Sequence, residues 1–196
     1  MKDFVLASAS PRRKELLSIL NMKFDVVKSD ADESAVPKNL PPNTYVRELA
    51  MLKAVSAVKH LKRDMYVIGA DTVVECEGEI MGKPKNPEDA ARMLRLLSGQ
   101  THRVYTGICV LRSEDGFAAG TYACTEVQFR TLEAEEIEAY IASGEPFDKA
   151  GGYAVQGLAS IFIEEIRGDY FNVVGLPLYK LSKLLKDEFG IDVLKG

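Results

Sequence analysis

The sequence predicts a mixed α/β fold, in which helices pack on a strongly twisted mixed sheet. Helical patterns alternate with apolar strand-like runs early in the chain, and hairpin signals appear later. Hydrophobic residues make up 46% of the 196 residues and charged residues 28%, as in ordinary globular proteins. This length suits one domain, residues 1–196, built as a single unit or as two lobes.

The first half of the chain predicts alternating strands and helices. Ser10 and Pro11 are typical of an N-cap and a first helical position, and Asn86-Pro87 repeats the signal. We expect a strand over 4–7, then a helix from 11 with Leu16, Leu17 and Leu20 inward, a strand over 24–28 and a loop over 30–42. The next helix is capped by Asn43 or Thr44 and ends near 61. A strand over 65–76, a turn at 77–78 and a helix from 87 that Gly99 ends complete this half.

The second half predicts two hairpins and two helices. Asp115-Gly116 is a strong hairpin signal between two runs rich in β-formers. In order, we expect strands over 102–112 and 117–130, a helix capped by Thr131 and ending near 143, a second hairpin of 161–166 and 170–174 across Arg167-Gly168, and a closing helix over 176–189.

Charge and cysteine content restrict the function classes. The formal net charge is −4 and the sequence has no continuous basic stripe, which argues against nucleic-acid binding. No apolar run approaches the roughly 20 residues that span a bilayer. Cys76, Cys109 and Cys124 are isolated, so a zinc site or a disulfide framework is not expected, and small core or strand positions are. An anionic ligand would need a local basic cluster.

The first candidate site is the segment from Ser8 to Arg13, where a strand passes into a helix. A helix start offers unpaired N–H groups and partial positive charge. The hydroxyl of Ser8 and the guanidiniums of Arg12 and Arg13 would there form a phosphate cradle. A capped helix with solvent-facing arginines is the equally weighted alternative.

Lys53 is the second candidate, because it interrupts an apolar stripe. Val46, Leu49, Ala50, Ala54 and Ala57 recur at spacings of three and four. A lysine inside that stripe must either extend its stem to solvent, which is the commoner outcome, or reach an anion.

Asp71 is the third candidate, directly after the apolar run that ends in Gly69-Ala70. Acids at strand ends often face ligands in α/β proteins. Asp71 could bind a metal or activate a water, with Lys83 of Gly82-Lys83-Pro84 as a nearby cation and Glu33 as a second carboxylate. The alternatives are a turn aspartate for Asp71 and a merely solvated loop around Glu33.

The fourth candidate is the glycine-rich segment 148–157, which suggests close backbone approach to a ligand, although a mobile loop would have the same composition. Taken together, the candidates supply two arginines, two lysines and two carboxylates. None has a Ser/His/Asp order. That set suits phosphate chemistry, in which cations neutralise a polyphosphate and acids hold a divalent ion and direct a water.

These segments resemble the motifs of the Maf family. The resemblance lies in Ser8-Ala-Ser-Pro-Arg-Arg, Gly69-Ala-Asp-Thr-Val-Val, Gly82-Lys-Pro, Met93-Leu-Arg-Leu-Leu-Ser-Gly, Thr106-Gly and Ser143-Gly-Glu-Pro-Phe-Asp-Lys-Ala-Gly-Gly-Tyr-Ala-Val-Gln-Gly. They follow one another in the family's order from residue 6 to about 180. Gly152 and Met81 depart slightly from the family pattern.

The resemblance implies an elongated sheet with two lobes around a central cleft, similar to the inosine triphosphatase-like fold. It also implies cytoplasmic homodimers that split a nucleoside triphosphate between the α and β phosphorus atoms with Mg²⁺ or Mn²⁺. By position, Asp71 matches the proton acceptor and Glu33 another active-site position, and our hypothesis is that these two carboxylates hold the metal. The other positions carried over are Ser8, Arg12, Arg13, Lys53 and Lys83 in the active site and Arg12, Thr72 and Gln156 for base choice.

The segment ending in Gln156 resembles the branch of the family that acts on dTTP and UTP. Uracil and thymine present acceptor, donor and acceptor groups, which the amide of Gln156 can partly match. A guanine edge would better suit a carboxylate, and an unpaired buried polar group costs roughly 1–3 kcal/mol. The alternatives are a 7-methyl-GTP or other nucleotide pyrophosphatase, and a non-enzymatic regulator of septum formation.

Overall fold

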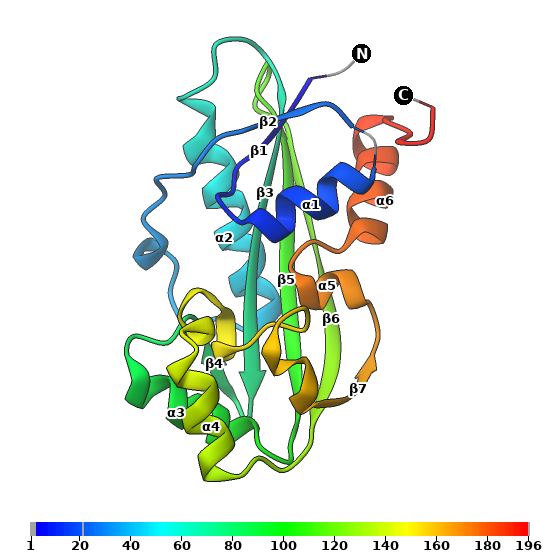
Figure 1. Cartoon of the computed structure of the whole chain (residues 1–196). Coiled ribbons are helices and arrows are strands. Elements are labelled where there is room, and N and C mark those ends of the chain that lie inside the picture. Colours follow the sequence, from blue (N-terminus) through cyan, green and yellow to red (C-terminus); the bar gives the residue numbers. More distant parts are fainter. Residues whose placement is uncertain (1–2, 21, 196) are drawn as a thin grey trace. The chain divides into compact units, whose positions relative to one another are not determined.

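The structure is a computed structural model that describes residues 3–20 and 22–195 (Figure 1). The strands are β1 (Phe4–Leu6), β2 (Phe24–Val26), β3 (Tyr66–Cys76), β4 (Glu79–Met81), β5 (Thr101–Arg112), β6 (Ala118–Phe129) and β7 (Ile163–Arg167). The α-helices are α1 (Pro11–Ile19), α2 (Pro42–Val58), α3 (Pro87–Leu97), α4 (Ala134–Ala142), α5 (Tyr170–Val174) and α6 (Leu178–Phe189). The 3-10 helices are η1 (Glu33–Ala35), η2 (Glu145–Asp148), η3 (Ala150–Gly152) and η4 (Leu158–Phe162).

The strands form one mixed sheet, which confirms the predicted fold class. Its order is β2-β1-β3-β5-β6-β7, and β4 pairs with β3 beside this path. β1 runs parallel to both β2 and β3, while the β3–β4 and β6–β7 pairs are antiparallel. The parallel pairs follow from the early alternation of strands and helices, and β3–β4 is a hairpin, whereas the chain reaches β7 from β6 only after α4 and three 3-10 helices.

The chain divides into two compact units. Unit 1 draws on Met1–Asp71, Thr106–Ala123 and Gly175–Gly196, and unit 2 on Thr72–Tyr105 and Cys124–Val174. Each unit has its own apolar cluster of buried side chains. The predicted cleft of a two-lobed molecule stays a prediction.

In unit 1, helix α2 packs directly on strand β3. The predicted stripe is buried, and Ala50, Ala54 and Ala57 join Val5 and Val67 in one cluster. The residues of β3 alternate between the two faces of the sheet, so the face that carries Val67 continues along the strand with Gly69 and Asp71. Packing of this stripe, rather than helix propensity, fixes α2 against the sheet.

Three helix boundaries differ from the predictions. α2 begins at Pro42, because the carbonyl of Pro41 accepts from the N–H of Thr44 and of Tyr45, both at 2.9 Å, so neither Asn43 nor Thr44 is the cap. The same helix ends at Val58 rather than near 61. Separately, Leu16 and Leu17 of α1 are buried as expected, but Leu20 is only half-buried. α4 begins at Ala134, after a capping box of Glu133 and Glu136, so Thr131 does not cap it.

The predicted second hairpin is wrong. β7 forms, but residues 170–174 are helix α5. Asp169 Oδ1 accepts from the N–H of Phe171 at 2.8 Å, which starts a turn rather than an extended strand. The buried side chain of Asn172 donates to Val104 O and Thr125 Oγ1, each at 2.9 Å, and these side-chain bonds take the place of strand pairing. β4, which follows the predicted turn at 77–78, was not expected.

The three cysteines carry free thiols. Cys76 and Cys109 are buried, whereas Cys124 is exposed on β6. Burial raises the pKa of Cys109 to about 12. Within the described ranges, none of the helices combines the length and the apolar character that a membrane crossing requires.

Candidate functional site

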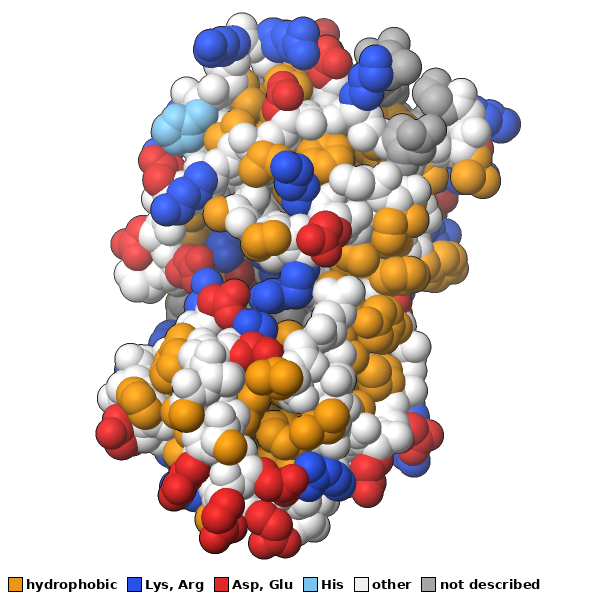
Figure 2. Space-filling view, in the orientation of Figure 1, with side chains coloured by type: hydrophobic (Ala, Val, Ile, Leu, Met, Phe, Trp, Pro, Cys, Tyr) orange, Lys and Arg blue, Asp and Glu red, His pale blue; other side chains and the backbone are white. Residues whose placement is uncertain are grey.

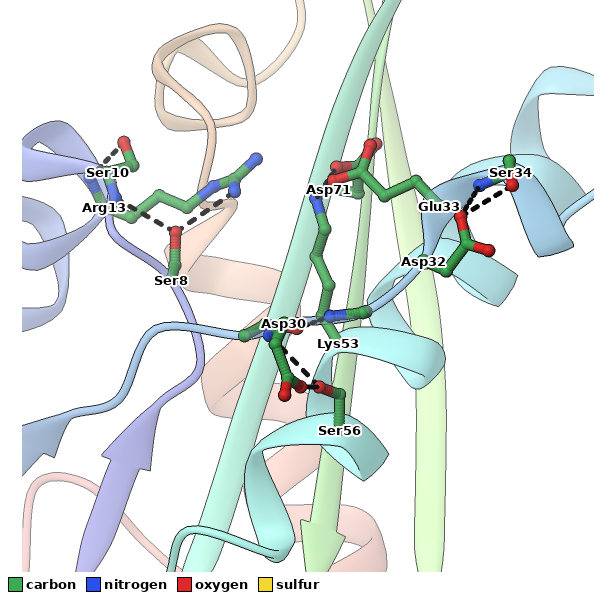
Figure 3. A network of polar contacts seen from close by, with 12 residues as sticks. Ser8, Ser10, Arg13, Asp30, Asp32, Glu33, Ser34, Lys53, Ser56 and Asp71 are labelled. Atoms are coloured by element: carbon green, nitrogen blue, oxygen red, sulfur yellow. Dashed lines mark hydrogen bonds and ion pairs between the residues drawn. The ribbon is translucent and has the colours of Figure 1, made fainter.

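The start of α1 holds two serine hydroxyls and a guanidinium close together (Figure 3). Ser10 Oγ caps the helix by accepting from Arg13 N at 3.4 Å. Ser8 Oγ accepts from Ser10 N at 3.2 Å and from Arg13 Nη1 at 3.4 Å. Arg13 Nε donates to the carbonyl of Gly175 at 2.8 Å, so the side chain is anchored at two points. This arrangement differs from a capped helix with solvent-facing arginines.

Arg13 belongs electrostatically to a larger charged cluster. Burial lowers the pKa of Arg13, the negative charges of Asp71 and Glu33 oppose that shift, and the neighbouring charge of Arg12 adds to it. Both arginine side chains are half-buried rather than fully exposed. A site of this kind favours the binding of additional negative charge.

Lys53 connects two acids from separate elements. Its Nζ pairs with Asp71 Oδ1 of β3 and with Glu33 Oε1 of η1, the latter at 2.8 Å (Figure 3). The side chains of Lys53 and Asp71 are only 14% and 12% exposed, while Glu33 is 57% exposed. Lys53 therefore reaches anions instead of extending into solvent.

The position of Lys53 follows from close packing of α2 on β3. A Cβ on Gly69 would lie 2.1 Å from Ala50 O and 2.9 Å from Ala54 N, so only glycine permits this approach. Asp71 follows two residues later on the same strand face. Lys53, between the two packed alanines and one turn along from Ala50, is thereby brought to the carboxylate.

Asp30 and Ser56 tie the acidic loop to α2, and the sequence did not single out either residue. Asp30 N donates to Ser56 Oγ at 3.2 Å, and Ser56 Oγ bonds to the Asp30 carboxylate in return. These bonds and the charge of Lys59 lower the pKa of Asp30 to about 2. The loop around Glu33 is thus attached to the helix that carries Lys53, rather than merely solvated. Ser56 lies three residues after Lys53, on the same helix face, and that spacing was the available signal.

Tyr45 is a further residue that the sequence did not indicate. It lies in the first turns of α2 and is 7% exposed. Burial raises its pKa, and the charges of Asp71 and Glu33 add to that shift, while Lys53 opposes it. Tyr45 therefore lies within electrostatic reach of the charged cluster, and its raised pKa favours the neutral phenol. An aromatic residue in an apolar stripe is normally core, so its sequence gave no distinguishing signal.

The unit 1 cluster fits a divalent cation with substrate phosphates as additional ligands. Lys53 pairs with the carboxylates of Asp71 and Glu33, the charge of Arg13 interacts with both, and Arg12 adds a positive charge near Arg13. Asp71 and Glu33 converge on one ammonium, and Mg²⁺ commonly takes one or two carboxylates plus phosphates and waters. Across residues 3–20 and 22–195, no group of three or more His, Cys, Asp or Glu side chains could hold a metal unaided.

The remaining predicted site residues lie in unit 2. Lys83 and Gln156 are exposed and Thr72 is half-buried. Gln156 lies in a turn that Gly157 N closes by donating to Ala154 O at 3.2 Å, and the next residue but one, Leu158, donates its N–H to Glu145 Oε2 at 2.9 Å. Convergence of Thr72, Lys83 and Gln156 with the cluster in unit 1 stays a prediction.

The charged side chains on one face of the molecule are of both signs. On the face drawn in Figure 2, acidic and basic side chains of the described residues are interspersed and form no continuous basic stripe. Local convergence of basic groups, as at Arg12, Arg13 and Lys53, is what distinguishes the site.

Over almost its whole length, the chain is similar to several proteins that carry the same name. It is 51% identical over 193 residues to a dTTP/UTP pyrophosphatase of Moorella thermoacetica, covering 98% of both chains. It is 50% identical over 194 residues to a dTTP/UTP pyrophosphatase of Alkaliphilus metalliredigens, covering 99% of this chain and 100% of the relative.

A solved structure supports the fold independently. A HAM1 protein from Coxiella burnetii matches with a TM-score of 0.51 and 15% identity, over 95% of this chain and 100% of that one. At this identity the likeness concerns the fold alone, and it agrees with the mixed sheet described above. The family model of the Maf-like proteins matches residues 3–188. With that match and relatives at half identity, the chain belongs to the Maf family.

Proposed function

We propose that this chain is a nucleoside triphosphate pyrophosphatase that hydrolyses dTTP and UTP to the monophosphate and pyrophosphate. The observation that carries the proposal is Lys53 held between Asp71 and Glu33, with Arg13 in the same electrostatic cluster. The names of the relatives at about half identity supply the substrate class. Cleavage between the α and β phosphorus atoms is part of the same proposal.

Phosphate binding falls to the basic groups. Arg13 offers a guanidinium whose Nε is already fixed on Gly175, so less conformational entropy is lost on binding. Arg12 and Lys53 add charge, and Ser8 adds a hydroxyl at the helix start. Lys83 of unit 2 completes the proposed set as a further phosphate-binding cation.

Asp71 directs the attacking water. Its carboxylate is nearly buried, and Lys53 holds it in one orientation, so an oxygen can accept a proton or a hydrogen bond from a water. Asp71 and Glu33 would also hold Mg²⁺ or Mn²⁺. When bound, such a cation supplies charge neutralisation at the phosphates and acidifies a coordinated water. Lys53 stabilises the negative charge that accumulates on the leaving pyrophosphate.

Gln156, Thr72 and Arg12 supply base choice in this proposal. An amide offers both a donor and an acceptor to the pairing edge of uracil or thymine. Gln156 is exposed, as a residue that contacts a ligand from solvent would be.

The test is pyrophosphate release from a panel of nucleotides. We expect dTTP and UTP to be hydrolysed faster than CTP, inosine triphosphate and 7-methyl-GTP. Asp71→Asn keeps the side-chain size but removes the negative charge, and should lower kcat by about 100-fold or more. Asp187→Asn is the control, because Asp187 is exposed on α6 and pairs only with Lys183 among the contacts described. Equal turnover of wild type and Asp71→Asn would refute the catalytic role of Asp71.

The family resemblance further supports a homodimer in the cytoplasm. Sedimentation of the purified chain would give the mass of the assembly, against 21.6 kDa for one copy. A monomer at cellular concentrations would contradict the first point. Recovery of the native chain in a membrane or secreted fraction would contradict the second.

A further inference from the structure

Both neighbours of Lys83 rest on one pair of glycines in unit 2. Gly151 N donates to Gly82 O at 2.9 Å, and Gly82 directly precedes Lys83. A Cβ on Gly152 would lie 3.3 Å from Pro84 Cγ, and Pro84 directly follows Lys83. The backbone on either side of Lys83 is therefore held by the same turn. The Lys83 side chain is exposed, so little packing restrains it. The turn can therefore act on Lys83 only by fixing the position of its Cα.

Only glycine fits at the centre of this turn. Gly151 has φ of 66°, which L side chains rarely adopt. A Cβ at this position would lie 2.8 to 3.2 Å from three side-chain atoms of Val74. Val74 is 2% exposed and belongs to the apolar cluster of unit 2, so it has little freedom to move away.

A buried polar pair anchors the turn from its other end. Tyr153 follows the glycine pair and is 5% exposed, and its hydroxyl lies 2.7 Å from His102 Nε2. Both rings meet Phe129 edge-on, with centroids 4.8 Å away for Tyr153 and 4.9 Å for His102. This hydrogen-bonded aromatic pair fixes the position of the chain at Tyr153. If the backbone there shifted, the Tyr153 hydroxyl and His102 Nε2 would be buried without their hydrogen bond.

We infer that Gly151 and the Tyr153–His102 pair are positioning residues that hold Lys83 for the polyphosphate of the substrate. None of the three is a catalytic residue, since each acts through the backbone of 82–84. The inference rests on the proposed function and goes beyond it, because it assigns a role to a buried histidine and tyrosine that the phosphate chemistry does not use. The turn sets where the Lys83 ammonium can reach, and a misplacement of about 1 Å can cost about 100-fold in rate.

Gly151→Ala is the primary test, with Gly144→Ala as its matched control. Both glycines have positive φ, 66° and 77°, but a Cβ on Gly144 meets nothing within 4 Å. The control therefore reports the cost of backbone strain alone. We expect Gly151→Ala to lower kcat/KM for UTP by about 10-fold or more, mostly through KM, and Gly144→Ala to change it by less than about twofold. Adding Val74→Ala to Gly151→Ala makes room for the new methyl group and should restore part of the loss.

A double-variant cycle with Lys83→Met separates positioning from general structural support. If the turn acts through Lys83, then Gly151→Ala has no further effect on kcat/KM once Lys83 is replaced. A merely structural role predicts the same fold-loss in both backgrounds, and that additivity would overturn the inference. Should Gly151→Ala fail to fold, Tyr153→Phe takes its place in the cycle, because it removes only the hydroxyl and keeps the ring. Absence of UTP hydrolysis by wild type would instead refute the proposed function itself.

Discussion

The ammonium of Lys53 lies on the buried face of α2 and pairs with two carboxylates. A lysine held at 14% exposure without an anion would lose hydration with no compensation. The pairing with Asp71 removes that cost in the free protein. It also means that an incoming polyphosphate competes with Asp71 and Glu33 for the same ammonium, so substrate binding and the freeing of the carboxylates are linked.

Gln156→Glu tests base reading at the level of one side chain. The substitution exchanges the amide donor for a second acceptor and adds a charge, at an exposed position where folding should be little affected. We expect the ratio of kcat/KM for UTP over 7-methyl-GTP to fall by about 10-fold or more. Steady-state kinetics on both nucleotides measure it, and an unchanged ratio would remove Gln156 from base choice.

His102 makes stability depend on pH in a defined window. Burial lowers its pKa to about 4 from the usual 6.5, and the interaction of the ring with the backbone of Gln100 opposes part of that shift. Between pH 6.5 and 4 the unfolded chain therefore binds a proton that the folded chain does not. The contribution of His102 is fully present above pH 6.5 and falls as pH drops through this window, and the loss of unfolding free energy amounts to about 3 kcal/mol by pH 4.

Urea unfolding of wild type and His102→Gln at several pH values checks this dependence. The free energy of unfolding of the variant should fall less steeply than that of wild type between pH 6.5 and 4. His60→Gln is the matched control, because His60 is the other histidine of the chain and is exposed, with 45% of its side chain accessible. Parallel curves for wild type and His102→Gln would show that His102 does not drive the effect.

At the scale of elements, Gly69 controls the contact between α2 and β3. Gly69→Ala would place a methyl group 2.1 Å from a backbone oxygen that cannot rotate away. We expect a loss of at least about 2 kcal/mol of unfolding free energy, because α2 must shift. Hydrolysis should also fall, since Lys53 moves with the helix.

Gly116→Ala is the control for this substitution. Gly116 has φ of 73° in the β5–β6 turn, and a Cβ there meets nothing within 4 Å. Left-handed strain of about 1–2 kcal/mol is then the only cost, without loss of activity. If Gly69→Ala proves as active as Gly116→Ala, close packing of α2 does not position Lys53.

Elements with a strong local signal could be predicted from the sequence, and those decided by distant partners could not. Asp115-Gly116 and Asn86-Pro87 fixed a hairpin and a helix start, because the turn and cap chemistry lies within a few residues. The sequence predicts a strand where α5 forms, because Asn172 is satisfied by Val104 and Thr125, which are remote in sequence. No local pattern encodes those bonds.

At the scale of the whole molecule, the order of the motifs predicted the family, and the described cluster contains Glu33, Lys53 and Asp71 together. Asp30, Tyr45 and Ser56 could not be predicted, because their roles depend on the packing of separate elements. Residues that break a pattern, such as Lys53 in its stripe, are visible in a sequence. Residues that support them are ordinary in type and position, so only the fold reveals them.

Removal of divalent cations tests the whole molecule. The described cores are apolar clusters. Within residues 3–20 and 22–195, no three or more His, Cys, Asp or Glu side chains are grouped so that they could hold a metal ion. We therefore expect a chelator to abolish UTP hydrolysis while the melting temperature changes by less than about 2 °C. Excess Mg²⁺ should restore the activity. Undiminished hydrolysis in the chelator would contradict the proposed use of a metal, and a large drop in melting temperature would indicate a structural metal instead.

The uneven burial of the three thiols has a practical consequence. Burial raises the pKa of all three thiols, but Cys76 and Cys109 are buried from reagents whereas Cys124 is exposed on β6. A thiol-directed fluorophore should therefore attach at a single known position without prior mutagenesis. The emission of a fluorophore at Cys124 would report on changes around β6 as nucleotides are added, so the wild-type sequence can be used for fluorescence measurements of binding.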